Sequence, residues 1–180
     1  MNKTISHRRG ALLTPARIVG WGTIVTLILL PAVAMQFTTE VNWTMADFTF
    51  ATVMLGGVGL AFEMAVRANG SWAYRGGAAL ALVAGLLLLW VDAAVGIVGN
   101  ESDDMNLWFD LIPLLALFGA TGARFRSGGM ATAMFATAIA QVLVAIILQL
   151  TGHFTWVFTS VWLGAWLLSA WLFRKSARDA

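Results

Sequence analysis

The sequence contains no cysteine and very little charge. Without cysteine the chain can form neither disulfides nor thiolate metal sites. Charged residues make up 11% of the chain and apolar residues 59%, whereas a soluble domain carries about 25% charged residues. A chain of this kind has too few polar side chains to cover a globule in water, so its composition indicates a protein that is embedded in lipid.

The apolar residues form continuous runs, and the basic residues stand between those runs. Continuous rather than alternating runs favour transmembrane helices over a β-barrel. Three intervals, 18–66, 76–123 and 127–173, hold no Lys or Arg, and each can contain two spans of about 20 residues with a turn. We therefore predict an all-α, polytopic transmembrane helical bundle whose six helices form three hairpins. The predicted spans are 18–37, 47–66, 76–98, 106–123, 130–150 and 154–173. The predicted parts of the chain are a basic tail at 1–17, a transmembrane domain at 18–173 and a second basic tail at 174–180.

All eleven basic residues fall on the side of this bundle that also holds both termini. Since Lys and Arg concentrate in cytoplasmic loops, we predict that both termini and both tails are cytoplasmic. Ala32-Val33-Ala34 resembles a signal-peptidase site, but the apolar run from Ile18 is longer than that of a usual signal peptide, so we expect a retained first helix. The opposite, outer side receives seven of the nine acids, at the surface or just below it: Glu40, Asp47, Asp92, Glu101, Asp103, Asp104 and Asp110.

Asp92 is the acid most in need of an explanation, because an ionised side chain inside a bilayer costs about 2.5–3.5 kcal/mol at the helix centre. It lies seven residues before Gly99, about 10 Å below the outer end of the predicted span. Gly85, Gly96 and Gly99 share its helical face, and glycines allow close approach of another helix. We expect Asp92 to point into the bundle, either as a proton or cation site or as a hydrogen-bonded residue that joins helices.

Three other acids of the predicted spans have competing interpretations. Asp110 is either a helix cap or, if the helix begins near Asn106, a buried site residue. Asp47 is best explained as the N-cap of a helix over 48–66. Glu63 precedes Arg67 by four residues, the favourable order for a helical ion pair, although it also ends a stripe of small and polar residues. Asp47 and Glu63 remain secondary candidates for the proton or cation site.

The outer acids have no Lys or Arg to pair with between residues 92 and 110. His153 is the only titratable base on that side, and it either meets Asp92 or Asp110 or lies in a surface turn. The connecting loop is rich in oxygen donors that suit Ca²⁺ or Mg²⁺, although a solvated acidic loop is the more ordinary interpretation. These donors are Asn100, Glu101, Asp103, Asp104 and Asn106.

The last two predicted spans carry polar stripes at helical spacing. Interhelical packing is the simpler explanation of both stripes, and a polar pathway is the alternative. The fifth span has Thr137, Gln141, Ala145 and Gln149, and the sixth has Thr155, Thr159, Trp162, Trp166 and Ser169.

Common catalytic signatures are missing from the sequence. It has no H-E-x-x-H, no Walker loop and no G-x-G-D motif. The two histidines, His7 and His153, fall on opposite sides of the predicted bundle and cannot share one haem iron. We therefore predict no enzymatic activity and no cofactor. The basic tails are short, and attraction to the membrane surface explains them better than nucleic-acid binding does.

The stretch "WVDAAVGIVGNESDDMNLWF" resembles the central part of a family of small, uncharacterised bacterial multi-pass inner-membrane proteins. The matching residues are Trp90, Ala94-Val95-Gly96-Ile97, Gly99, Glu101 and Asn106. The resemblance implies a bacterial inner-membrane location and no particular activity.

Two functional hypotheses follow from the sequence. In the first, the protein takes part in proton- or cation-linked transport or binding, with an acidic site around Asp92 and Asp110 that is open to the periplasm. In the second, it is a non-catalytic membrane subunit or assembly partner, in which nine Trp residues and the small-residue faces dock a second copy or another membrane protein. The lipid bilayer is the expected surrounding in both.

Overall fold

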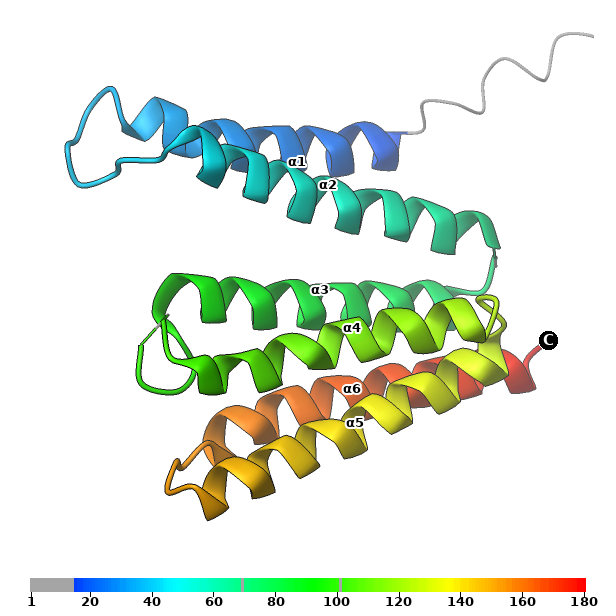
Figure 1. Cartoon of the computed structure of the whole chain (residues 1–180). Coiled ribbons are helices and arrows are strands. Elements are labelled where there is room, and N and C mark those ends of the chain that lie inside the picture. The colour runs from blue at the N-terminus through cyan, green and yellow to red at the C-terminus, as the bar shows by residue number, and fades with distance from the viewer. Residues whose placement is uncertain (1–14, 69, 101) are drawn as a thin grey trace, which may run out of the picture. The chain divides into compact units, whose positions relative to one another are not determined.

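The computed structural model describes residues 15–68, 70–100 and 102–180, and within them the chain forms six α-helices, one short 3-10 helix and no β-strand (Figure 1). The predicted all-α fold with six apolar helices is confirmed. The helices are α1 (Pro15–Ala34), α2 (Met45–Ala68), α3 (Trp72–Val95), η1 (Asp104–Asn106), α4 (Leu107–Gly122), α5 (Ser127–Leu150) and α6 (Trp156–Arg178).

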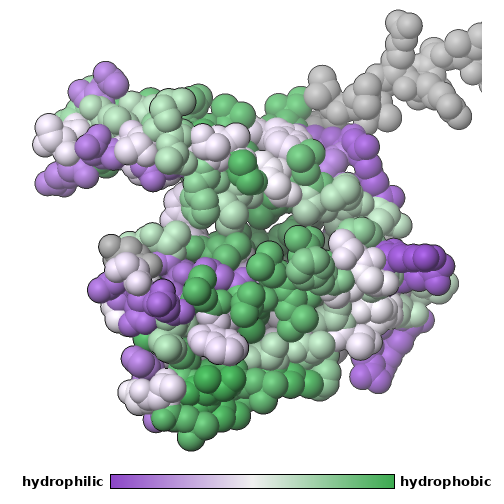
Figure 2. Space-filling model, viewed as in Figure 1, coloured by the Kyte–Doolittle hydropathy of each residue, from purple (hydrophilic) through white to green (hydrophobic). Residues whose placement is uncertain are grey.

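Each α-helix is long and apolar enough to cross a bilayer. The longest, α2, α3 and α5, have 24 residues each, and about 20 residues suffice. The shortest, α4, has 16 residues, but η1 extends it to a helical segment of 19 residues, Asp104–Gly122. On α3 to α6, apolar side chains cover the middle of the helices and polar ones gather at the ends (Figure 2).

The chain divides into two compact units, residues 1–60 and 61–180. In the first unit, α1 lies against α2 at a glycine. A Cβ added to Gly59 would lie 2.6 Å from Cδ1 of Ile24 and 3.2 Å from the Trp21 ring, so the missing side chain allows this contact.

The second unit is a bundle in which α3 packs on α4 and α6, and α5 packs on α4 and α6 (Figure 1). Small residues bring these helices close together. A Cβ at Gly77 would lie 3.2 Å from the Ser169 carbonyl oxygen, and one at Gly119 would lie 2.8 Å from Cβ of Ala133. Such contacts are the usual basis of helix packing in membranes, where apolar burial alone drives little association. The largest fully buried side chains are Trp166, Tyr74, Phe109, Phe173, Leu88 and Met134.

Two side chains of α6 bind backbone carbonyls of α3 and thereby define how these helices are aligned. Ser169 Oγ donates to the Gly77 carbonyl at 2.8 Å, and Trp162 Nε1 donates to the Ala84 carbonyl at 2.9 Å. Interhelical hydrogen bonds in membranes each contribute about 0.6–1.7 kcal/mol. Seven residues forward along α3 therefore correspond to seven residues back along α6, as expected for antiparallel neighbours.

The end of the bundle where α6 terminates is basic. Helix α6 continues through Arg174 and Lys175 to Arg178, residues that the sequence analysis assigned to a tail, and positive side chains in a last helical turn stabilise the helix. Nζ of Lys175 lies 4.5 Å from the centre of the Trp72 ring. At the same end, Tyr74 Oη donates at 2.7 Å to the Phe125 carbonyl in the turn between α4 and α5. We call this end of α3–α6 the basic end, and the end with residues 92–110 and 150–156 the acidic end.

Candidate carboxyl site at the acidic end

Asp92 occupies the last turn of α3, because the helix ends at Val95. The backbone turns away at two glycines with positive φ, Gly96 at 71° and Gly99 at 63°, a conformation that glycine adopts without strain. The expectation that both glycines continue the helix is therefore wrong. Asp92 lies three residues, about 4.5 Å, from the helix end rather than about 10 Å below it. Gly85 does lie within α3, where it faces Pro113 of α4.

Asn106 holds the chain that leaves α3, and it is 3% exposed. Its Oδ1 accepts from the amides of Ile97 at 3.0 Å and Val98 at 2.8 Å. Its Nδ2 donates to the carbonyls of Val98 at 3.2 Å and Asn100 at 2.7 Å. All four bonds satisfy backbone groups beyond the helix end, so the amide that the sequence analysis grouped with cation ligands has a structural role.

Two other oxygen donors of this loop, Asp103 and Asn100, also bind within the loop. Oδ1 of Asp103 accepts from the Met105 amide at 2.9 Å and caps η1. Oδ1 of Asn100 accepts from the Ser102 amide at 2.9 Å and from its hydroxyl at 2.6 Å. Asp104 is exposed, and Glu101 lies outside the described residues. Among the residues that the structure describes, no three His, Cys, Asp or Glu side chains are grouped so that they could hold a metal ion.

Asp92 and Asp110 lie close enough across the contact between α3 and α4 for their carboxyl groups to affect each other electrostatically. Asp92 is 7% exposed, and its Oδ1 has no hydrogen-bond partner among the described residues. Asp110 is half-buried in the first turn of α4. The helix begins at Leu107, which agrees with the interpretation that Asp110 lies inside a helix that starts near Asn106.

One buried threonine at the start of α6, Thr155, lies near the level of Asp92. The alignment of α3 with α6 places Asp92 opposite residues 154 and 155. Thr155 is the N-cap residue of α6. Thr159 shares the helical face of Trp162 and Ser169, which both donate to α3, and the same alignment places it opposite residue 87, more than one turn from Asp92. The two threonines are 5% and 1% exposed, and neither hydroxyl has a hydrogen-bond partner within the described chain. The sequence analysis explained them as packing residues, because spacing alone does not show which helix they face.

A further polar side chain is buried between α5 and α6. Gln141 is 0% exposed, and its Oε1 accepts from Trp166 Nε1 at 3.4 Å. Its Nε2 has no acceptor in the described part of the chain. Most residues of the polar stripes of α5 and α6 are thus buried in the bundle, but Gln149 is exposed. The buried atoms of these stripes without a partner in the described chain are Nε2 of Gln141 and the two threonine hydroxyls.

The other candidate residues do not join this pair. Asp47 forms a capping box at the start of α2, because its Oδ2 accepts from the Thr44 amide at 2.7 Å and its own amide donates to Thr44 Oγ1 at 3.4 Å. The N-cap residue is therefore Thr44, and Asp47 is the third helical residue. Oε1 of Glu63 accepts from Nε of Arg67 at 2.9 Å, the predicted ion pair.

His153 lies in the turn between α5 and α6 rather than on the carboxyl pair. Its Nδ1 is 3.2 Å from the Thr151 hydroxyl, and it forms no ion pair with any carboxylate that the structure describes. The interpretation as a turn histidine therefore agrees with the structure. In residues 61–180, every Lys and Arg lies at the basic end of the bundle. No described Lys or Arg of this unit therefore neutralises Asp92 and Asp110 at the acidic end.

The six apolar helices define a multi-pass α-helical membrane protein in contact with lipid. The chain matches no protein-family model, no curated protein sequence and no solved structure. The resemblance to bacterial inner-membrane proteins in residues 90–109 therefore stays a prediction.

Proposed function

We propose that this membrane protein binds a proton at the carboxyl pair of Asp92 and Asp110 as part of proton- or cation-linked transport. The proposed location is the bacterial inner membrane, with both termini in the cytoplasm and the acidic end facing the periplasm. The concentration of Lys and Arg at the opposite end supports this orientation, because basic residues accumulate on the cytoplasmic side.

The observation that carries the proposal is the pairing of buried Asp92 with half-buried Asp110, with no Lys or Arg beside them among the described residues. One ionised side chain within a bilayer is already costly, and a second charge of the same sign beside it adds repulsion. A proton on the pair removes one charge and allows the two carboxyl groups to share a hydrogen bond. Because Oδ1 of Asp92 has no donor among the described residues, that atom can accept or carry the proton.

The ligand set favours a proton over a divalent cation. Calcium takes six to eight oxygen ligands and magnesium six, but only two carboxylates approach each other here, and the described residues hold no group of three His, Cys, Asp or Glu that could bind a metal ion. The buried Thr155 hydroxyl, near the level of Asp92, has no hydrogen-bond partner in the described chain, so it can donate to a carboxylate or accept from a carboxylic acid. Asp110 is the more exposed of the two acids, so a proton that arrives from the acidic end reaches Asp110 first.

Proton flux into liposomes tests this proposal. Purified protein is reconstituted with a pH-sensitive dye inside the vesicles, and a pH gradient is applied. We expect flux above that of empty liposomes for the wild type, and a fall to the empty-liposome rate for Asp92→Asn and Asp110→Asn. Asp104→Asn is the matched control, because this exposed loop acid lies near the pair without joining it.

The outcome also separates the two functional hypotheses. Flux that persists in both Asp92→Asn and Asp110→Asn, or a wild type no faster than empty vesicles, contradicts proton-linked transport through this pair. The interpretation as a non-catalytic subunit or assembly partner would then take its place, with a co-purifying membrane protein or a stable homo-oligomer as the expected finding.

A further inference from the structure

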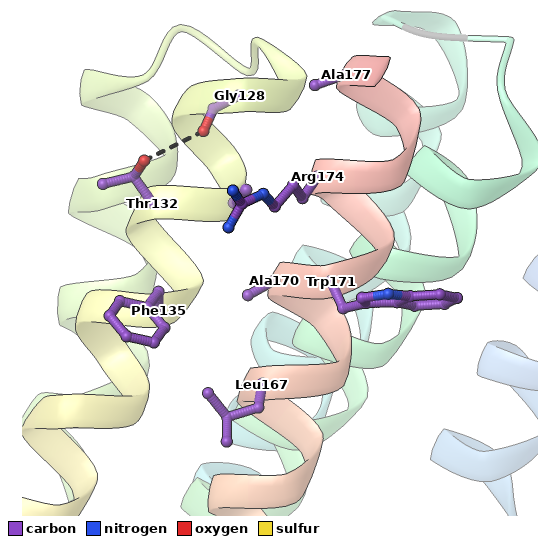
Figure 3. Close-up of a pocket in the computed structure, with 9 residues that line it drawn as sticks. Gly128, Thr132, Phe135, Leu167, Ala170, Trp171, Arg174 and Ala177 are labelled. Atoms are coloured by element: carbon purple, nitrogen blue, oxygen red, sulfur yellow. Dashed lines mark hydrogen bonds between the residues drawn. The ribbon is translucent and has the colours of Figure 1, made fainter. Parts of the chain in front are cut away.

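A groove of about 570 Å³ lies between α5 and α6 at the basic end of the bundle (Figure 3). Gly128, Thr132 and Phe135 of α5 line one wall, and Leu167, Ala170 and Arg174 of α6 line the other. The Arg174 side chain extends from α6 across the groove toward α5 (Figure 3). A positive charge thus lies in a groove that is otherwise lined almost entirely by small and apolar residues.

Arg174 is exposed, and no described residue neutralises its charge. Arg174 forms no ion pair or hydrogen bond with any residue that the structure describes. Residues 1–14 contain no Asp or Glu, so the N-terminal segment has no carboxylate side chain to offer. The adjacent Lys175 lies over the Trp72 and Trp171 rings instead. The occupant that complements this groove therefore carries a negative charge.

The apolar residues of the groove indicate that the occupant also has an apolar portion. Phe135 and Leu167 lie farther from the helix ends than Arg174 does, and they are 53% and 40% exposed. Ala170, between Leu167 and Arg174 on α6, adds only a small side chain to this wall of the groove. An occupant with an anionic group at the helix end and a hydrocarbon chain toward the membrane middle matches both features.

A second copy of this chain matches the groove less well. At the basic end the acids of residues 61–180 are Glu63, already paired with Arg67, and Asp179. A parallel neighbour would therefore bring mostly further Lys and Arg to Arg174, and like charges repel. A lipid with a phosphate head group has no such conflict, and basic pockets between transmembrane helices are suited to anionic head groups.

We infer that the groove between α5 and α6 binds one anionic phospholipid, with its phosphate on Arg174 and an acyl chain along Phe135 and Leu167. The Thr132 hydroxyl lies on the opposite wall, and its single proton, donated to the Gly128 carbonyl at 3.3 Å, can turn to the same phosphate when that bond is released. Such a lipid would join α5 to α6 at the membrane surface. The inference does not depend on the carboxyl pair at the acidic end.

The test is the thermal stability of the detergent-solubilised full-length protein during titration with phosphatidylglycerol or phosphatidylcholine. For the wild type we expect phosphatidylglycerol to raise Tm and phosphatidylcholine to raise it much less. Arg174→Gln should weaken the apparent phosphatidylglycerol affinity roughly five- to tenfold, since one basic residue contributes about 1 kcal/mol to attraction for anionic lipid. Arg178→Gln removes a charge from the same helix outside the groove and should leave the affinity within about twofold.

A second pair of variants tests the groove itself. A Cβ at Gly128 or at Gly57 would meet nothing within 4 Å, so Gly128→Leu and Gly57→Leu should both fold. Gly128→Leu fills the groove and should abolish the preference for phosphatidylglycerol, whereas Gly57→Leu on α2 should not. Native mass spectrometry should show one bound phosphatidylglycerol in the wild type and none in Gly128→Leu.

Several outcomes overturn the inference. Equal stabilisation by the two lipids shows that the groove has no head-group preference. If Arg174→Gln and Arg178→Gln weaken the apparent phosphatidylglycerol affinity equally, the basic end attracts anionic lipid in general and the groove is not a specific site. An unchanged phosphatidylglycerol titration in Gly128→Leu, or a stable dimer that crosslinks through α5 and α6, shows that lipid does not occupy the groove.

Discussion

Asn106 holds the backbone of Val98 from both sides, accepting from its amide at 2.8 Å and donating to its carbonyl at 3.2 Å. The same amide side chain also binds Ile97 and Asn100. It therefore determines how the chain leaves α3 and enters η1, next to the carboxyl pair.

Asn106→Ala should destabilise the protein by roughly 2–4 kcal/mol, because each buried backbone group left without a partner costs about 1–3 kcal/mol. Unfolding in detergent mixtures, followed by circular dichroism, measures the change. Asn100→Ala is the control, since Asn100 is exposed and binds only Ser102 with its side chain. Equal destabilisation by the two variants would contradict the role assigned to Asn106.

Gly99→Ala should lower the free energy of unfolding by about 1–3 kcal/mol through two effects. Its φ of 63° disfavours a side chain, and a Cβ there would lie 2.7 Å from Oδ2 of Asp103. Gly152→Ala separates the effects, because Gly152 has a φ of 92° and no atom within 4 Å of an added Cβ. Gly99→Ala should be the more destabilising of the two in thermal melts, and the reverse order would contradict this explanation.

Thr44→Ala and Asp47→Ala should each destabilise α2 by about 1 kcal/mol, because each removes one half of the capping box. The double variant should lose less than the sum of the two, since both halves depend on the same pair. Thermal melts of the four proteins give this comparison. Neither change should alter proton flux. Loss of flux in Asp47→Ala would show that Asp47 takes part in the functional site.

The absence of cysteine provides a clean background for testing orientation. Asp104→Cys at the acidic end and Ala177→Cys at the basic end give two single-cysteine proteins in which both positions are exposed. In intact bacteria with a permeabilised outer membrane, a membrane-impermeant maleimide should label Asp104→Cys and should label Ala177→Cys only after the inner membrane is disrupted. The opposite labelling pattern would reverse the proposed topology.

The distribution of Lys and Arg was sufficient to predict six apolar helices, because spans and turns differ so strongly in composition. The end of α3 was not predictable from local sequence. Gly96 and Gly99 are compatible with a membrane helix, and the helix ends where Asn106, several residues later, binds the departing backbone. Local residues do not reveal such a contact before the loop geometry is known.

The two acids of the candidate site could each be selected from sequence, because a carboxyl group in an apolar span is rare. The first functional hypothesis placed them in one acidic site, but the sequence gives no reason for their carboxyl groups to interact, since that depends on how α3 and α4 are aligned. The position of Thr155 and Thr159 likewise follows from the hydrogen bonds of Ser169 and Trp162 to α3. Helical spacing shows which residues share a face, but it does not show which neighbour that face meets.

The central claim is that Asp92 and Asp110 share a proton, and pH-dependent infrared difference spectroscopy of the reconstituted protein tests it most directly. We expect the wild type to show the carbonyl band of a protonated carboxylic acid whose intensity changes with pH. That band should disappear in both Asp92→Asn and Asp110→Asn and persist in Asp104→Asn. A band that survives in both pair variants, or a wild type without one, would contradict the account.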